Sequence, residues 1–299
     1  MKDNDVLDFR KNDVVDFYER LYELDNQYKI VNLDKTMGIH IGYYEKNIRT
    51  IEDAVINMNY FVGKLLNLNI LNETKKECRV LDAGCGVGGT SIHLAKKYPN
   101  IKFKGITISP FQVRLANKFA QDNNVTSNTK FLLRDYLKTE FPNDYFDGIS
   151  AIESIGHASE KKDFLIEMYR ILKTNKKLVI VGFFLIEKPS NYFFKIAYDF
   201  VRNNWKIPYM ETIKIFKLDL EDTGFTDIEI INITKNLRRS FFVLLLRILS
   251  CYSRNKSKDN ENISQANYRN NFKKVIKYLF PLIIFYFNIR YLIFTAKKR

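Results

Sequence analysis

Apolar runs of strand length alternate with amphipathic runs of helix length through most of this chain. The run at residues 145–154 is almost continuously apolar, as expected for a central parallel strand. The predicted strands are residues 79–83, 101–109, 128–136, 145–154, 176–185, 224–236 and 290–298. The predicted helices between them include residues 90–98, 109–124 and 160–173. This alternation predicts an α/β fold with a doubly wound sheet of seven strands.

No segment rich in Pro, Gly or Ser divides the 299 residues, so we expect a single domain. Its parts are predicted to be an N-terminal helical flap at 1–75, a ligand-binding core at 76–185, and the remaining strands at 186–299 with insertions at 186–218 and 238–290. Open α/β sheets bind ligands at the carboxyl ends of their strands, where such insertions form caps. The insertions are therefore predicted to form a lid and a substrate pocket.

The turn after the first predicted strand is rich in glycine, in the sequence RVLDAGCGVGG at residues 79–89. Gly84, Gly86 and Gly89 fit the pattern G-x-G-x-x-G, in which glycine allows positive φ angles and close approach of the backbone to a ligand. Asp82 precedes these glycines in the strand's last turn. The alternative interpretation is a tight strand-to-helix turn without a ligand.

The end of the second predicted strand argues against a nicotinamide cofactor. A dinucleotide-binding enzyme places an acidic residue about 20 residues after its glycines, where it binds the ribose. Here the strand at 101–109 ends in Thr107 and Ser109, with no carboxylate. The glycine turn is therefore predicted to receive a different cofactor that carries a nucleoside.

The composition of the chain indicates which binding partners and which cellular compartment to expect. The net charge of +14 favours anionic partners, although a soluble surface in a lysine-rich proteome explains it equally well. The three cysteines form neither a disulfide framework nor a metal site, which indicates a reducing compartment. The charged N-terminus lacks a secretory signal, so a cytoplasmic location is expected.

Two apolar stretches, at residues 241–252 and 275–294, are candidates for membrane spans. The first is shorter than the roughly 20 residues that a span needs, and Lys277, Pro281 and Arg290 interrupt the second. Their aromatic and basic residues instead suit a helix that lies on an anionic membrane, so peripheral membrane association is an additional expectation. The polar run at residues 255–264 is predicted to be an exposed loop.

Three stretches together resemble the class I S-adenosylmethionine-dependent methyltransferases, in the group of tocopherol, sterol and isoprenoid C-methyltransferases and cyclopropane synthases. They are LDAGCGVGG at 81–89, GITISPFQ at 105–112 and SAIESIGHAS at 150–159. The segment MGIHIGYYEKNIRTIEDAV at 37–55 also resembles this group. The resemblance extends from about residue 14 to the C-terminus. It implies a Rossmann-like methyltransferase sheet and S-adenosylmethionine as the cofactor.

The resemblance also implies a set of cofactor-binding residues: Asp82, Gly84, Gly86, Val87, Gly88, Thr107, Ile108, Gln112, Asp135, Tyr136, Ile152 and Tyr43. In this set the amide of Gln112 replaces the usual carboxylate at the ribose. Asp135 would accept a hydrogen bond from the adenine amino group, with Tyr136 beside the ring. The alternative for Asp135 is a helix N-cap.

The predicted catalytic residues are Glu153, His157 and His40. If the acceptor is an alkene carbon, methylation creates a cation that Glu153 would stabilise. If the acceptor is a hydroxyl or an amine, His157 is the natural base. His40 would face the acceptor. Two alternatives stay open: His157 as a ligand of the cofactor carboxylate or the cap of a loop, and Glu153 as a structural hydrogen-bond partner.

The leading interpretation is C-methylation of a small hydrophobic acceptor that resembles an isoprenoid or a lipid. The aromatic segment at 190–210 supports an apolar pocket. The alternative is N- or O-methylation of a small metabolite such as an amine, alkaloid or phenol. A sterol, a prenyl diphosphate and cyclopropanation are less favoured, and the absence of ligand spacing predicts no metal.

Two hypotheses from other classes stay open: a nucleic-acid-binding protein and a membrane-associated binding protein without activity. Nucleic acid is not expected as a partner, because the basic residues near the C-terminus alternate with long aliphatic runs. The tyrosines of an amphipathic helix at 13–29, Tyr18, Tyr22 and Tyr28, are predicted to belong to the flap or to plain packing. The sequence leaves the oligomeric state open.

Overall fold

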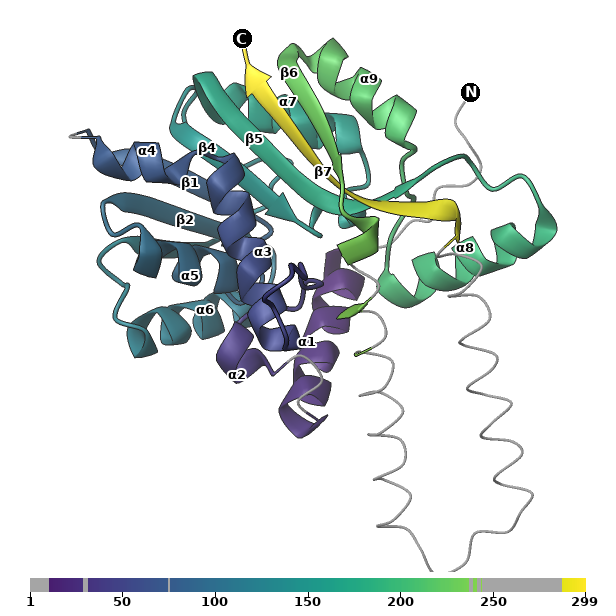
Figure 1. Cartoon of the computed structure of the whole chain (residues 1–299), viewed down its shortest axis with the longest axis horizontal. Helices are drawn as coiled ribbons and strands as arrows, with labels where there is room; N and C mark the ends of the chain where they lie inside the picture. The colour runs from purple at the N-terminus through teal and green to yellow at the C-terminus, as the bar shows by residue number, and fades with distance from the viewer. Residues whose placement is uncertain (1–10, 29–31, 75, 237–238, 241–242, 244–286) are drawn as a thin grey trace, which may run out of the picture.

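A computed structural model describes residues 11–28, 32–74, 76–236, 239–240, 243 and 287–299 of the chain. Its centre is one seven-stranded sheet with the strand order β3-β2-β1-β4-β5-β7-β6 (Figure 1). The strands are β1 (Cys78–Ala83), β2 (Ile101–Thr107), β3 (Thr129–Leu133), β4 (Phe146–Ile152), β5 (Leu172–Leu185), β6 (Phe225–Asn232) and β7 (Ile289–Lys298). The predicted α/β class and the seven strands are confirmed.

Strands β1 to β5 pair in parallel, whereas β7 runs antiparallel to both β5 and β6. The strand boundaries differ in places from the prediction. Strand β5 begins at Leu172 instead of residue 176, and β3 ends at Leu133 instead of residue 136. Asp135 therefore follows the strand, where its carboxylate accepts a hydrogen bond from the Leu137 amide and turns the backbone. The two ends of this sheet are thus a parallel edge at β3 and an antiparallel edge at β6.

Alternating apolar residues give the sheet a hydrophobic core on each face. Successive side chains of a strand point to opposite faces. Val80 accordingly packs into the core under one set of helices, and Leu81 packs into the core on the other side. Ile293 and Phe294 in β7 divide in the same way. The pattern explains why these strands read as nearly continuous apolar runs in the sequence.

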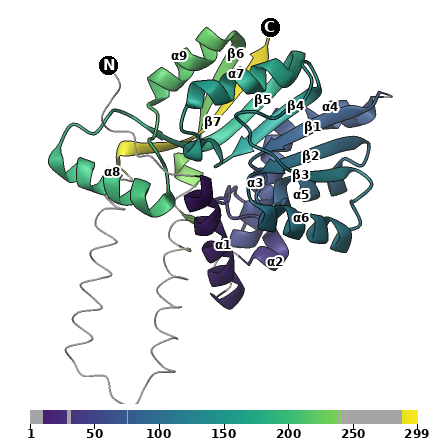
Figure 2. The same cartoon turned by 180° about the vertical axis from the view of Figure 1, so that it is seen from behind.

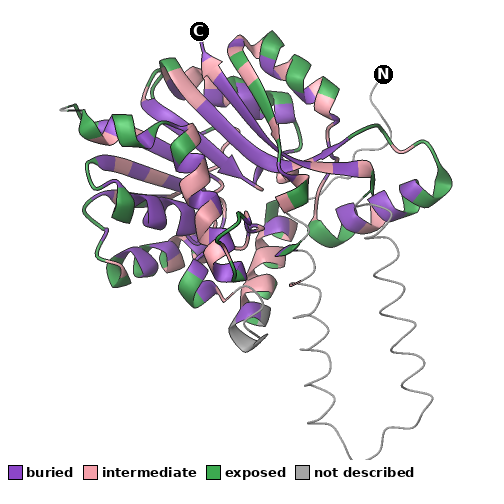
Figure 3. Ribbon diagram, in the orientation of Figure 1, coloured by how far each residue is buried: buried purple, intermediate pink, exposed green. Residues whose placement is uncertain are grey.

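Helices α3 (Ile51–Leu65), α5 (Gly89–Lys97) and α6 (Pro110–Asp122) cover one face, and α7 (Lys161–Ile171) and α9 (Ile213–Thr223) cover the other (Figures 1 and 2). The short helix α4 (Leu68–Glu73) follows α3. Colouring by burial shows the helix surfaces that face the sheet as buried and their outer surfaces as exposed (Figure 3). This three-layer arrangement leaves the carboxyl ends of the parallel strands as the place for a ligand.

The N-terminal segment lies beside those carboxyl ends. It contains α1 (Lys11–Tyr28), which confirms the predicted helix, and α2 (Leu33–Thr36). The carbonyl oxygen of Met37 lies so close to α5 that a Cβ on Gly89 would come within 2.1 Å of it. The segment after α2 therefore packs directly on the first turn of α5, and a side chain at Gly89 would push it away.

The predicted insertion at 186–218 has two different roles in the fold. Helix α8 (Tyr192–Trp205) stands out from the sheet, as expected for a cap. Residues 213–218 instead belong to α9, whose Phe216 and Leu220 are fully buried against the sheet. The end of the segment is thus part of the helix layer because these two residues complete its core.

Much of the predicted insertion at 238–290 lies outside the described residues, including the run at 255–264 predicted to be a loop. The same holds for most of the apolar stretches at 241–252 and 275–294, although the second ends in β7. In the part of the chain that the structure describes, no helix is long and apolar enough to cross a membrane.

Candidate functional site

The glycine loop after β1 forms the floor of a cavity at the carboxyl ends of the strands. Gly84 and Gly86 have φ angles of 83° and 54°, which favour glycine. A Cβ on Gly84 would lie 2.3 Å from the Cβ of Ser154, so the end of β4 needs a glycine here to approach β1. A Cβ on Gly86 would meet nothing within 4 Å. The loop therefore leaves open space above Gly86, which lines the cavity.

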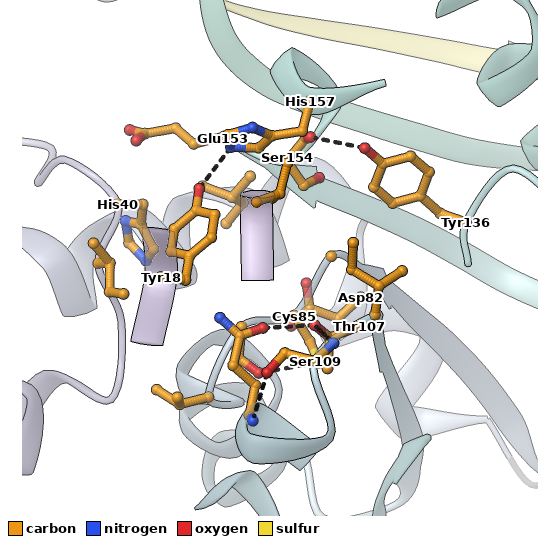
Figure 4. A pocket seen from close by; sticks show the side chains of 18 of the residues that line it. Tyr18, His40, Asp82, Cys85, Thr107, Ser109, Tyr136, Glu153, Ser154 and His157 are labelled. Atoms are coloured by element: carbon orange, nitrogen blue, oxygen red, sulfur yellow. Dashed lines mark hydrogen bonds between the residues drawn. The ribbon is translucent and has the colours of Figure 1, made fainter. Parts of the chain in front are cut away.

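The cavity has a volume of about 370 Å³ and gathers most of the predicted site residues (Figure 4). The predicted residues that line it are His40, Asp82, Gly84, Gly86, Val87, Thr107, Ile108, Gln112, Asp135, Tyr136, Ile152, Glu153 and His157. They come from the ends of four neighbouring strands and from the segment after α2. Such a convergence of strand ends is the usual ligand site of an open α/β sheet.

Two predicted cofactor residues, Gly88 and Tyr43, are not part of the cavity lining. Gly88 has a φ angle of 91° and lies where a Cβ would come within 2.7 Å of the Phe131 ring, so its role is to let the loop pack on β3. Tyr43 stacks on Phe61 of α3, with ring centroids 4.6 Å apart. The structure thus brings neither residue to the ligand space.

Asp82 is buried at the end of β1, where it accepts a hydrogen bond from the Ser91 hydroxyl at 3.0 Å. Burial raises the pKa of its carboxyl to about 6, against the opposing effect of the Ser91 hydrogen bond. A carboxylate held in this way is a strong acceptor for N–H or O–H groups of a ligand.

The end of β2 is held by a compact set of hydrogen bonds. The Thr107 hydroxyl donates to the side-chain carbonyl of Gln112 at 2.6 Å. The Ser109 hydroxyl caps α6 by accepting a hydrogen bond from the backbone N–H of Gln112, and Pro110 occupies the first helical position. The cap fixes the start of α6, so Gln112 presents its amide beside the glycine loop without carrying charge.

Asp135 and Tyr136 line the cavity beyond the end of β3. The second carboxylate oxygen of Asp135 contacts the ammonium of Lys11, the first residue of α1. The Tyr136 hydroxyl donates to the Ser154 carbonyl at 3.2 Å, and its ring packs edge-on against Phe164. These contacts fix both side chains in the cavity wall, and the cap alternative for Asp135 is replaced by a local turn.

His157 forms a polar pair with Tyr18 of α1. The Tyr18 hydroxyl lies 2.8 Å from Nε2 of His157, and Nδ1 of His157 lies 3.1 Å from the Lys206 carbonyl. A carbonyl only accepts, so Nδ1 carries the proton and Nε2 accepts from the phenol. Burial lowers the pKa of His157 to about 4. The ring is therefore neutral at pH 7, and Nε2 has an unprotonated lone pair.

Glu153 lies directly after β4 and is partly buried, with a φ angle of 52° that is strained for a residue with a side chain. Its Oε1 accepts from the Tyr291 hydroxyl at 2.6 Å and from the Ile41 amide at 2.9 Å. Burial raises the pKa of this carboxyl, and the two hydrogen bonds oppose that rise. Glu153 thus joins β4, β7 and the N-terminal segment at the cavity.

His40 lines the cavity on the side opposite Tyr136 (Figure 4). Its Nε2 lies 3.0 Å from Oδ1 of Asn59, and its Nδ1 lies 3.3 Å from the Ile41 carbonyl. Burial lowers the pKa of His40 to about 4, so it is neutral at pH 7. Both ring nitrogens face protein groups, and its predicted role at the acceptor stays a prediction.

Several lining residues are absent from the predicted set: Lys11, Val14, Val15, Met37, Cys85, Thr90, Ser154 and Trp205. Thr90 directly follows the glycine motif, so its place at the start of α5 was readable from the sequence. The residues of α1 had only an amphipathic pattern, which does not say which face meets a ligand. Within the described ranges, no cluster of three or more His, Cys, Asp or Glu side chains would hold a metal ion.

A family model for a methyltransferase domain matches residues 74–212. Ajmaline N-methyltransferase of Rauvolfia serpentina is 39% identical over 108 residues, which cover 36% of this chain and 37% of that protein. The O-methyltransferase rstn1 of Aspergillus nomiae NRRL is 29% identical over 72% of this chain and 94% of its own length. The 2-methyl-6-phytyl-1,4-hydroquinone methyltransferase of Synechocystis sp. is 31% identical over 63% of this chain and 59% of its own length. The chain thus spans only part of the length of the Rauvolfia serpentina and Synechocystis sp. relatives.

Solved structures share the fold along nearly the whole chain. The cyclopropane synthase MmaA2 of Mycobacterium tuberculosis has a TM-score of 0.74 at 19% identity, and the match covers 98% of this chain and 99% of that one. A geranyl diphosphate methyltransferase in complex with GPP and sinefungin has a TM-score of 0.72 at 13% identity, covering 97% and 99%. At these identities the likeness shows the fold alone.

Proposed function

This chain belongs to the class I S-adenosylmethionine-dependent methyltransferases, and we propose that it methylates a nitrogen or oxygen atom of a small, largely apolar acceptor. The observation that carries the proposal is the Tyr18–His157 hydrogen bond within the same cavity as the glycine loop. An N-methyltransferase, an O-methyltransferase and a hydroquinone methyltransferase all match this chain, so the proposal for the acceptor atom rests on this geometry.

The residues of the cavity fit S-adenosylmethionine. The open space at the Gly86 Cβ position forms a cradle for a ligand that approaches the backbone. Gln112 and Thr107 offer an amide and a hydroxyl where the ribose would lie, and Asp135 offers a carboxylate for the adenine amino group. The cofactor would supply an electrophilic methyl group on a positively charged sulfur. Asp82 would accept from its ammonium group.

The protein would hold the acceptor in line with that methyl group and keep water out, which is the main requirement of such a displacement. Apolar side chains of Val14, Val15 and Trp205 line the cavity beside Tyr18 and favour an acceptor with an apolar body. Most of a small molecule would be enclosed by these walls and by α1.

An N–H or O–H acceptor must lose its proton as the new bond to carbon forms. Tyr18 is placed to take that proton on its oxygen while its own proton passes to Nε2 of His157. The step creates one new charge, the imidazolium of His157, and leaves the phenol neutral. Burial and the Glu153 carboxylate raise the pKa of Tyr18, so both disfavour a phenolate there. Glu153 thus helps to keep Tyr18 protonated, whereas the Tyr18–His157 pair moves the proton.

A second candidate is C-methylation of an isoprenoid or lipid-like acceptor. The observation that favours it is the Glu153 carboxylate in the cavity wall, since a carbon acceptor becomes a cation after methylation. Tyr18 and Tyr136 add aromatic faces to that wall. In this reaction the Tyr18–His157 pair would remove the proton after the methyl group is transferred.

The cofactor is tested by titration calorimetry with S-adenosylmethionine and S-adenosylhomocysteine. The wild type is expected to bind both, and Gly86→Arg is expected to bind neither, because its side chain would fill the open space over the loop. Gly156→Ala is the matched control, since a Cβ there meets only Ile207 atoms at 3.9 Å. A folded wild type that binds neither compound would overturn the methyltransferase proposal.

The acceptor is tested with a donor labelled in its methyl group, incubated with primary and secondary amines, phenols and prenylated hydroquinones. Label on nitrogen or oxygen supports the proposal, and label on carbon supports the second candidate. Tyr18→Phe should slow transfer to nitrogen or oxygen by about 10²- to 10⁴-fold. Glu153→Gln should weaken transfer to carbon more than transfer to nitrogen or oxygen. Transfer to heteroatoms that survives Tyr18→Phe unchanged would contradict the proposed proton path.

A further inference from the structure

A buried hydrogen-bond network joins His40, Asn59 and Thr90 at the end of the cavity away from Tyr136. His40 Nε2 lies 3.0 Å and Thr90 Oγ1 lies 2.9 Å from Oδ1 of Asn59. Asn59 is fully buried, and its Nδ2 has no partner among the described residues. Neither the proton path nor the contacts assigned to the nucleoside use this network.

The hydrogen bonds decide which end of the Asn59 amide is nitrogen, because the two ends have the same shape. A neutral imidazole carries one proton, and the Ile41 carbonyl beside Nδ1 of His40 only accepts. The proton is therefore on Nδ1, and Nε2 needs a donor. With Oδ1 of Asn59 facing both His40 and Thr90, Nε2 would have no donor. The amide is therefore assigned the other way round, so that its nitrogen donates one hydrogen to Nε2 of His40 and the other to Oγ1 of Thr90.

This assignment uses both amide hydrogens and leaves only an oxygen unpaired, which costs less than leaving an N–H unpaired. It also changes what Thr90 offers to the cavity. Because Oγ1 of Thr90 accepts from Asn59, the single hydroxyl proton of Thr90 is free to donate elsewhere. Thr90 lines the cavity, so a bound ligand can accept that proton.

The position of Thr90 points to the kind of acceptor. It is the second residue of α5, where the helix carries partial positive charge. His40 and Tyr136 lie on opposite sides of the cavity (Figure 4). If the adenine lies by Tyr136 and Asp135, the amino-acid end of the cofactor reaches the side of His40 and Thr90. An anionic group at this end meets a hydroxyl donor and a helix N-terminus together.

We propose that Thr90, held by Asn59 and His40, donates a hydrogen bond to the carboxylate of the cofactor's methionine moiety. The inference rests on the proposed function for the identity of the cofactor. His40 is then a positioning residue that acts through Asn59, which differs from its predicted place at the acceptor. Asp82 and Thr90 together match the opposite charges of the amino-acid end.

The test compares S-adenosylhomocysteine with its decarboxylated analogue by titration calorimetry. Thr90→Val removes the hydroxyl at nearly constant shape and should weaken S-adenosylhomocysteine roughly 10- to 100-fold, the value of a hydrogen bond to a charged group. It should leave the affinity of the decarboxylated analogue unchanged. Thr90→Ser should restore binding. Thr129→Val is the matched control, because its hydroxyl donates to the Val125 carbonyl at 2.8 Å away from the cavity.

Asn59→Leu tests the positioning role. It should show the same selective loss for the compound with the carboxylate, since the Thr90 hydroxyl is no longer directed into the cavity. A structural defect would instead weaken both compounds equally. Equal losses for the two compounds, or unchanged binding in Thr90→Val, would overturn the inference while the proposed function stands. Wild-type protein that binds neither compound would overturn both.

Discussion

Replacing Tyr18 with Phe removes one atom from the site and interrupts the proposed proton path. The lost hydroxyl donates to Nε2 of His157 at 2.8 Å and is the proposed contact of the acceptor proton. A positioned proton acceptor contributes about 10²- to 10⁴-fold to rate, or about 3 to 5 kcal/mol of activation free energy. We expect kcat for a nitrogen or oxygen acceptor to fall by that factor, with little change in cofactor affinity.

The same substitution also has a predictable effect on stability. It leaves Nε2 of the buried His157 without its donor, which costs about 1–3 kcal/mol of unfolding free energy. Urea denaturation of Tyr18→Phe measures this cost separately from the rate. If Tyr18→Phe still unfolds in one cooperative transition, the variant is folded under assay conditions, and its transfer rate can be compared with that of the wild type.

The assay is single-turnover transfer of labelled methyl to the acceptor found in the screen, so that product release does not hide the chemical step. The control is Tyr22→Phe on the same helix, whose ring packs against Phe111 at 5.1 Å and which is not part of the cavity lining. It should keep the wild-type rate. A Tyr18→Phe rate within threefold of wild type would refute the role of the phenol and leave His157 without a path to the acceptor.

Three further predictions concern stability, charge and surface. The pKa values of His40 and His157 are lowered to about 4 in the folded state, so stability present above pH 6.5 is lost as the pH falls from 6.5 towards 4, by about 3 kcal/mol for each residue. In urea denaturation the wild type should lose about 3 kcal/mol more stability across this range than His157→Gln, because the raised pKa of Asp82 changes stability in the opposite direction in both proteins. An equal change in the two proteins would contradict the burial of a neutral His157 ring. Glu153→Gln keeps an oxygen that accepts both hydrogen bonds, so it should retain the affinity for the cofactor. Glu153→Ala should lower that affinity at least tenfold, as measured by calorimetry. Equal affinities of the two variants would refute the role of Glu153 in joining β4, β7 and the N-terminal segment. Phe193 of α8 is 62% exposed on a chain of net charge +14, so we expect the protein to sediment with anionic vesicles. The fraction bound should fall with added salt and in Phe193→Ser. Binding that neither change affects would show that this surface does not contact the membrane.

Predicted site residues that are close together in the sequence also lie close together in the structure. The glycine loop, the end of β2 with Thr107 and Gln112, and the stretch after β4 each lie within about ten residues, and their place at a strand end follows from the alternation of strands and helices. These residues do line one cavity in the structure. Tyr43 was also predicted to bind the cofactor, but its ring stacks on Phe61. The pattern of two adjacent tyrosines does not tell which surface each ring packs against.

The seven-strand α/β fold, the glycine loop and the resemblance to methyltransferases could be predicted from the sequence alone. The pairs of residues that give the site its chemistry come together only in the folded protein. Tyr18 and His157 are 139 residues apart, and Glu153 and Tyr291 are 138 apart. The same holds for the network of His40, Asn59 and Thr90. No local pattern encodes such pairs, because the partners meet only when helices and strands pack around a shared core and exclude water from the groups between them.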